Sequence, residues 1–174
     1  TKGLDGTIFA ADRSQGRLHP IHFDTVERYW YPQIPISFAV SNQEMILATG
    51  PDGDIWVAFR GTSTVQSMKK VNGLWVAQTA LNASFGTYTI AAGPGGTMWV
   101  GSTDGKASQL IEQEDTWKVL DPISAQGRTQ VATATDDGAL WWSDAGCALF
   151  SWKSTAGVAP AITSSASGSM TQGE

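Results

Sequence analysis

Hydrophobic and polar residues alternate along this chain in short runs that stop at glycines and aspartates. TYTIAAG (residues 87–93) ends at PGG, TMWVGS (97–102) ends at TDG, and a looser run at 107–113 leads to TWKVL at 116–120. β-branched and aromatic residues in runs of this length, bounded by turn residues that tolerate a positive φ, predict short strands joined by tight hairpins. No long apolar stripe with the period of a helix is present, so we expect an all-β chain.

The same pattern occurs four times, with a period between about forty and fifty residues. Each repeat has a glycine followed three positions later by an aromatic residue, which is Phe9, Trp56, Trp99 or Trp141. A second Trp recurs late in the first three repeats, at Trp30, Trp75 and Trp117. Four-stranded antiparallel units of this length are the blades of a β-propeller, and blades that stack radially bury each other's faces. We therefore predict about four blades and expect Trp56 and Trp99 to be buried between them.

The repeats set the expected domain boundaries. We expect a propeller over residues 1–163, followed by a Ser/Gly-rich tail at 164–174, with blades at 1–37, 38–82, 83–124 and 125–163. The first repeat lacks a first strand, and the tail segment Ser167–Gln172 would supply it in a closed four-blade ring. The alternatives are a piece of a larger ring, or a protomer that completes a ring with another copy. The missing initiator Met is consistent with a processed product or part of a longer chain.

The charge and composition of the chain exclude several classes of binding partner. The net charge is −5 and the 11 Lys and Arg residues are scattered, which argues against binding a nucleic-acid backbone. The single cysteine, Cys147, forms neither an intrachain disulfide nor a two-cysteine metal motif, and we expect it to line the core. No apolar run is long enough to span a membrane. We expect no cofactor and no metal site.

The repeated motif resembles that of the tectonin family of β-propellers, in which a short apolar strand precedes D-G-x-V-W and a late Trp. The resemblance covers residues 46–120 best, since the first repeat has Phe9 in place of Trp and the fourth lacks the late Trp. It implies a carbohydrate-binding lectin, with glycans or glycoprotein surfaces as partners and an extracellular or surface location. The D-G-x-W pattern also looks like that of virginiamycin B lyase-like propellers, which have more blades.

A sugar site needs an exposed aromatic ring and a few hydrogen-bonding groups beside it. The chain has eight Trp and three Tyr, more than the repeats use. If the ring closes, the fourth and first repeats are neighbours, so we predict a ligand groove there formed by Trp142, Trp152, Asp144, Tyr29 and Tyr31. Because strand neighbours face opposite sides, Trp142 points away from Trp141, and either packs against the adjacent blade or serves as a stacking platform.

Two other classes of function remain open. One is a recognition or assembly module of a larger surface protein, including self-association that completes a ring. The other is a propeller lyase or hydrolase, which the sequence favours less, because His19 and His22 fall on opposite faces of a strand and no nucleophile or metal motif is present. The turn residues Asp52, Asp104, Asp137 and Asp144 are interpreted first as turn caps.

Overall fold

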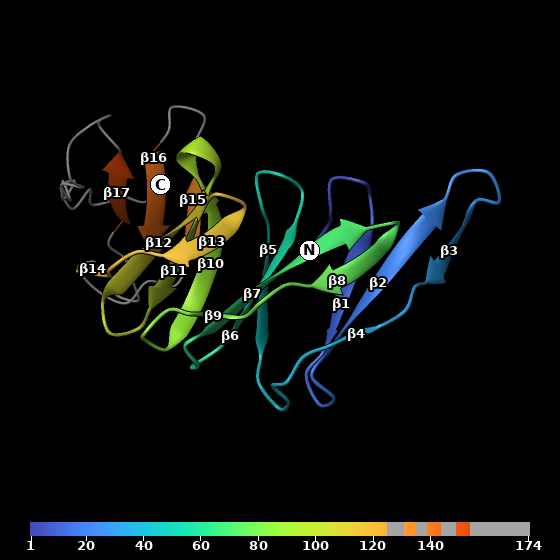
Figure 1. Ribbon diagram of the computed structural model, residues 1–174, viewed down its shortest axis with the longest axis horizontal. Coiled ribbons are helices and arrows are strands. Elements are labelled where there is room, and N and C mark those ends of the chain that lie inside the picture. The colour runs from blue at the N-terminus through green and yellow to red at the C-terminus, as the bar shows by residue number, and fades with distance from the viewer. Residues whose placement is uncertain (125–130, 135–138, 144–148, 154–174) are drawn as a thin grey trace, which may run out of the picture.

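The computed structural model describes residues 1–124, 131–134, 139–143 and 149–153, and these form four antiparallel sheets that follow one another along the chain (Figure 1). Three sheets have four or five strands, which confirms the all-β, propeller-type fold. Within the described ranges, the helical segment is a single 3-10 turn at Pro94–Gly96. The described residues contain no helix with the length and apolar character needed to cross a membrane.

Each sheet is a meander of adjacent strands. The first contains β1 (Ile8–Asp12), β2 (Arg17–Asp24) and β3 (Tyr29–Pro32), with β4 (Ile36–Ser37) paired to β2. The second contains β5 (Met45–Thr49), β6 (Ile55–Phe59), β7 (Thr64–Val71) and β8 (Leu74–Ala77), with β9 (Leu81–Asn82) paired to β7. The third contains β10 (Thr87–Gly93), β11 (Thr97–Ser102), β12 (Lys106–Gln113) and β13 (Thr116–Val119), with β14 (Ile123–Ser124) paired to β12. The fourth contains β15 (Val131–Ala134), β16 (Ala139–Ser143) and β17 (Leu149–Lys153).

The predicted repeat is visible in the backbone. The aligned glycines Gly6, Gly53 and Gly96 all have positive φ, at 83°, 91° and 77°, and each precedes the strand that carries the motif aromatic. Those strands are β1, β6 and β11, and β16 is their counterpart in the fourth sheet. β5, β10 and β15 come before β6, β11 and β16, whereas no described strand comes before β1. Ahead of β1, Lys2 forms an isolated antiparallel bridge with Ile8, in the register where Thr49 pairs with Ile55 and Ala92 with Met98.

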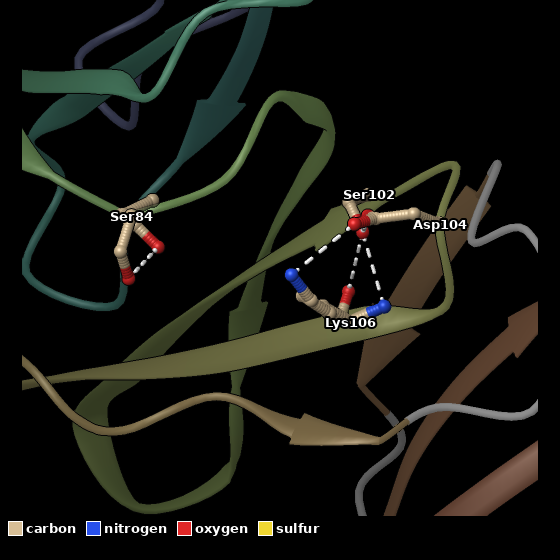
Figure 2. Close-up of polar contacts among 5 residues, drawn as sticks. Ser84, Ser102, Asp104 and Lys106 are labelled. Carbon is tan, nitrogen blue, oxygen red and sulfur yellow. Dashed lines mark hydrogen bonds and ion pairs between the residues drawn. The ribbon is translucent and has the colours of Figure 1, made fainter.

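The hairpin turns are closed by the residues expected from the sequence. Asn72 and Gly73 both have positive φ and join β7 to β8. Asp52 accepts a hydrogen bond from the backbone N–H of Asp54 at 3.2 Å, which is the predicted turn cap. Asp104 accepts a hydrogen bond from the Ser102 hydroxyl in the turn between β11 and β12 (Figure 2). Asp137 lies outside the described residues, as do Cys147 and the tail at 164–174.

The hydrophobic core lies between the sheets rather than inside any one of them. Leu18 and Phe9 of the first sheet pack with Ile55, Val57 and Met68 of the second. On its other side, the second sheet packs against the third through a cluster formed by Trp56, Val65, Met98, Val100 and Leu110. Trp56 and Trp99 are both buried, which confirms the structural role predicted for them.

The two aromatic registers of the sequence meet at these junctions. Phe9 of the first sheet contacts Trp75 of the second edge-to-face, with ring centroids 4.9 Å apart. Trp56 of the second sheet contacts Trp117 of the third in the same way, at 4.7 Å. The motif aromatic of one sheet therefore covers the late Trp of the next, which explains why both positions recur. Trp30, the late Trp of the first sheet, is 50% exposed.

Close packing of the motif aromatic also explains a further glycine in two of the motifs, Gly50 and Gly93. Glycine stands three positions before the aligned glycine in the first three repeats. A Cβ atom on Gly93 would lie 2.7 Å from Nε1 of Trp99, and one on Gly50 would lie 2.9 Å from Nε1 of Trp56. On Gly3 the same atom would lie 3.4 Å from Phe9, the smaller ring. The sequence suggested turn chemistry here, but at Gly50 and Gly93 the aromatic side chain also excludes a larger residue.

Candidate ligand-binding groove

The junction between the second and third sheets opens into a groove of about 260 Å³. Its lining is contributed mainly by the outer strands β7, β12 and β13 and by the segment after β8. Leu81 and the ring of Trp117 supply apolar surface. The polar lining residues are Asp54, Ser67, Lys69, Gln78, Thr79, Glu112, Asp115 and Thr116. The groove thus combines an aromatic ring with both hydrogen-bond donors and acceptors.

Local structure places the groove's aromatic and acidic groups side by side. Glu112 and Trp117 are cross-strand partners in the β12–β13 hairpin, which turns at Glu114 and Asp115. Both turn residues have positive φ, as a two-residue hairpin of the type I′ class requires. The edge-to-face contact with Trp56 fixes the position of the Trp117 ring. A ring fixed in this way loses little conformational freedom when a ligand binds.

Asp54 is a buried carboxyl in the groove with a raised pKa. It immediately precedes β6 and is only 6% exposed. Burial raises the pKa of its carboxyl to about 6, and the negative charges of Asp52 and Glu112 add to this rise, while Lys69 opposes it. Near neutral pH this carboxyl therefore changes between a hydrogen-bond donor and an acceptor.

A second groove of about 290 Å³ lies at the equivalent junction between the first and second sheets. It contains Trp75 at the position of Trp117, and it shares Asp54 and Lys69 with the first groove. Here Lys70 reaches across the junction and forms an ion pair with Asp5 at 2.7 Å. This groove is thus crossed by an ion pair between its two walls, whereas the described residues form no ion pair between the walls of the second–third groove.

The Asp5–Lys70 pair changes the electrostatics of the second groove. Burial pushes the pKa of Asp5 upward, but hydrogen bonds from Lys70 and Thr7 outweigh burial and hold the pKa below its ordinary value. Asp5 is therefore ionised near neutral pH and committed to Lys70. In the groove between the second and third sheets, Glu112 and Asp115 are exposed and form no ion pair with the described residues, which makes it the better candidate for binding a ligand.

The structure does not bring the predicted site residues together. Tyr29 and Tyr31 lie on one face of β3 with ring centroids 5.9 Å apart, and Tyr31 contacts His22 edge-to-face at 5.6 Å. The first and fourth sheets lie at opposite ends of the row of sheets (Figure 1). The expected groove between the first and fourth repeats is therefore not formed by the described residues.

The fourth-sheet members of that predicted site fall into two groups. Trp142 is 1% exposed, so it offers no free face for stacking and the platform interpretation is wrong for this structure. Trp142 follows the motif aromatic of its strand by one residue, as Val57 and Val100 do. Those two residues face the preceding sheet and are buried as well. The backbone of Trp152, in β17, pairs with that of Leu140 in β16, but the Trp152 side chain lies outside the described part of the structure. All of Asp144 also lies outside it.

Sequence reasoning missed Asp54, Glu112 and Trp117 as members of one groove. A signal for part of it was present, because a two-residue turn at 114–115 makes residues 112 and 117 cross-strand partners. The approach of Asp54 from the neighbouring sheet had no such local signal.

Comparisons with known proteins agree on architecture alone. No family model matches the chain, and no curated protein matches it. Several solved structures match the chain. One is virginiamycin B lyase from Staphylococcus aureus, determined in an inactive form with quinupristin. It is 15% identical to this chain with a TM-score of 0.64, and the match covers 93% of this chain and 53% of the lyase. A 6-phosphogluconolactonase-like protein from Bacteroides uniformis is 14% identical with a TM-score of 0.78, over 94% and 52%.

A lectin is also among the similar structures. The fucose-recognising lectin of Aleuria aurantia, described as a six-bladed β-propeller, is 13% identical with a TM-score of 0.58, over 91% of this chain and 55% of that one. This chain thus spans about half the length of the solved structures that it matches. At these identities the likeness establishes the fold, and the neighbours include both enzymes and lectins. The chain has the β-propeller fold, present here as a partial propeller of antiparallel sheets.

Proposed function

We propose that this chain is a non-catalytic, lectin-like propeller that binds a glycan in the groove between its second and third sheets. The tectonin-like motif pattern supports a lectin, and glycan partners are consistent with an extracellular or surface location. The observation that carries the proposal is the combination in one groove of the Trp117 ring with the carboxylates of Asp54 and Glu112.

The chemistry of this groove suits a sugar. A pyranose ring has an apolar face of C–H groups that stacks on an aromatic ring, and hydroxyls that donate to carboxylates. Glu112 is exposed beside Trp117 and is free of ion pairs among the described residues, so it is available to accept from two neighbouring hydroxyls. Gln78 adds an amide, which both donates and accepts.

A fucosylated glycan is the first ligand to test. The similar lectin from Aleuria aurantia was solved in complex with Fucα1-6GlcNAc. Its identity to this chain is too low to carry over any residue, so the support it adds concerns only the class of ligand. We therefore propose a neutral, deoxy-sugar-containing glycan rather than an acidic one, since the groove lining is itself acidic.

The test is a glycan array on the purified chain, followed by titration of the bound glycan with Trp fluorescence as the readout. Replacing Glu112→Gln is expected to weaken binding by roughly tenfold or more, because a hydrogen bond to a charged group contributes about 1.5–3 kcal/mol. Glu114→Gln is the matched control, since Glu114 is exposed on the same hairpin but does not line the groove. It is expected to leave the affinity unchanged.

Other results would redirect or reject the proposal. If Glu112→Gln binds like the parent while Tyr31→Ala does not, the glycan site includes the first sheet, which is one wall of the groove that the sequence predicted between the fourth and first repeats. If neither fucosylated nor any other glycan is retained by the parent protein, the carbohydrate-binding function is rejected.

A second candidate is glycoside hydrolysis in the same groove. The observation that favours it is the place of the buried Asp54 carboxyl in the groove beside Glu112, with a pKa raised to about 6, because a carboxyl that keeps its proton up to about pH 6 suits a general acid. Glu112 would be the second carboxylate that such a reaction needs. Prolonged incubation with the glycan identified on the array, followed by mass spectrometry, separates the two functions, since a lectin returns its ligand intact.

A further inference from the structure

The groove between the second and third sheets has a buried polar floor. Among the residues that line it, only Asp54 and Ser67 are buried, with exposures of 6% and 4%. The other lining residues are half-buried or exposed. We call Asp54 and Ser67 the groove floor. A ligand that fills the groove meets this pair with its most deeply inserted group.

The alternation of β7 explains why Ser67 lies at the boundary between the core and the rim. Val65, Ser67 and Lys69 point to the same side of the strand, and Val65 belongs to the cluster shared with the third sheet. Along this side Val65 is fully buried, Ser67 is 4% exposed and Lys69 is exposed. Ser67 pairs with Trp56, which Asp54 precedes by two residues. Both floor residues therefore belong to the wall that the second sheet contributes.

The Ser67 hydroxyl is an unpaired polar group in this wall. The Ser67 backbone carbonyl accepts a hydrogen bond from the N–H of Gln78 at 2.9 Å, but among the described residues the hydroxyl itself has no partner. Other buried hydroxyls, such as those of Thr87 and Ser102, donate to backbone carbonyls. Because an unpaired buried hydroxyl is costly, a hydrogen-bonding group that reaches Ser67 from the groove is favoured.

The two floor residues together suit a hydroxyl group of a ligand. A carboxylate only accepts hydrogen bonds, whereas a serine hydroxyl both donates and accepts. A sugar hydroxyl inserted at the floor can donate to Asp54 and accept from Ser67. A methyl group or a hydrogen at the same place leaves Ser67 unpaired and expels water without replacing its hydrogen bonds. Sites built to bond a hydroxyl reject analogues that lack it much more strongly than apolar sites reject an added group.

We propose that the groove floor is a hydroxyl subsite, which selects glycans that insert one free hydroxyl between Asp54 and Ser67. This inference rests on the proposed function, because it assigns the specificity of the same groove. In a deoxy sugar, the methyl group points away from the floor and a ring hydroxyl enters it. Trp117 and Glu112 orient the sugar, and Ser67 determines which of its hydroxyls is required.

The first test uses the parent protein, so it does not depend on the folding of a variant. Trp fluorescence measures its affinity for methyl α-L-fucoside, or for the methyl glycoside of whichever terminal sugar the array identifies. The same titration is made with each monodeoxy analogue of that glycoside. At least one analogue is expected to bind about tenfold more weakly or worse, because its removal of a bond to a carboxylate also leaves Ser67 unpaired.

The second test identifies the hydroxyl that enters the floor. Ser67→Ala is expected to weaken binding of the glycoside by roughly threefold to tenfold, as loss of a neutral hydrogen bond does. It is also expected to reduce the penalty for one monodeoxy analogue and to leave the penalties for the others unchanged, since only that analogue lacks the partner of Ser67.

Ser108→Ala is the matched control. Ser108 is also buried and its hydroxyl has no partner among the described residues, but it does not line the groove. This variant is expected to keep the affinity of the parent and the same penalty for every analogue. Circular dichroism verifies that both serine variants are folded.

Two results would overturn the subsite while glycan binding still stands. In one, every monodeoxy analogue binds the parent as tightly as the glycoside does. In the other, Ser67→Ala shows the same penalties as the parent for all analogues. If the parent binds no glycan at all, the proposed function and the subsite are both rejected.

Discussion

Replacing Asp54→Asn tests the electrostatic account of the groove. Asp54 is almost fully buried, and burial raises its pKa from 3.8 to about 6. The folded protein therefore holds this proton more tightly than the unfolded chain does. Below about pH 4 both states are protonated, so the burial of this group costs no ionisation energy. As the pH rises through about 6, the carboxyl ionises more readily in the unfolded chain, and stability is lost.

The size of the effect follows from the two pKa values. A rise of about two units corresponds to about 3 kcal/mol at most, since one unit is worth about 1.4 kcal/mol. The groove is open to solvent, so we expect a loss of about 1–3 kcal/mol in the parent between about pH 4 and pH 7. Asparagine has nearly the same shape and stays neutral, so the variant is expected to be more stable than the parent at pH 7 by about this amount.

The assay is urea unfolding of parent and variant at several pH values between about 4 and 8, analysed as the difference in free energy of unfolding. Taking the difference removes the contributions of carboxyls with lowered pKa, such as Asp5 and Asp104, whose stabilising effects have the opposite pH dependence. Asp115→Asn is the control, because Asp115 lines the same groove but is exposed. A difference between Asp54→Asn and the parent that is the same at pH 4 and pH 8 would refute the reasoning.

Three further predictions concern the sheet junctions. Gly93→Ala is expected to lower the free energy of unfolding in urea by about 1–3 kcal/mol, because the added Cβ would clash with Trp99, although the φ of −112° suits alanine. The loss should be smaller in a Trp99→Phe background, and an equal loss in both backgrounds would exclude the clash. Trp56→Ala is expected to lose about 3–5 kcal/mol, and an unchanged melting temperature would show that this ring does not support the junction. Lys70→Ala should lose no more than about 1 kcal/mol, less in high salt, because its ion pair with Asp5 is partly exposed; a larger or salt-independent loss would contradict this.

The strands, the turns and the repeat were predictable because they depend on neighbours in the sequence. The period of the strand pattern, the positive φ at Gly53 and Gly96, and the Asn72–Gly73 hairpin are all local properties of the backbone. The burial of Trp56 and Trp99 was also predictable, because the same aromatic position recurs in every repeat and a blade cannot bury both its faces alone. These arguments required no knowledge of which sheet lies next to which.

The candidate site depended on contacts between sheets, and these are decided by the tertiary structure alone. Trp142 and Tyr29 have equally plausible sequence contexts for a stacking ring, yet one is fully buried and the other exposed. Asp54 reads as a turn residue, and only its place among the packed sheets makes it buried and brings Glu112 near enough to add to the rise in its pKa. The physical reason is that strand formation follows from dihedral preferences and alternation along one segment. Exposure and pKa, by contrast, depend on solvent excluded and charges contributed by residues far away in the sequence.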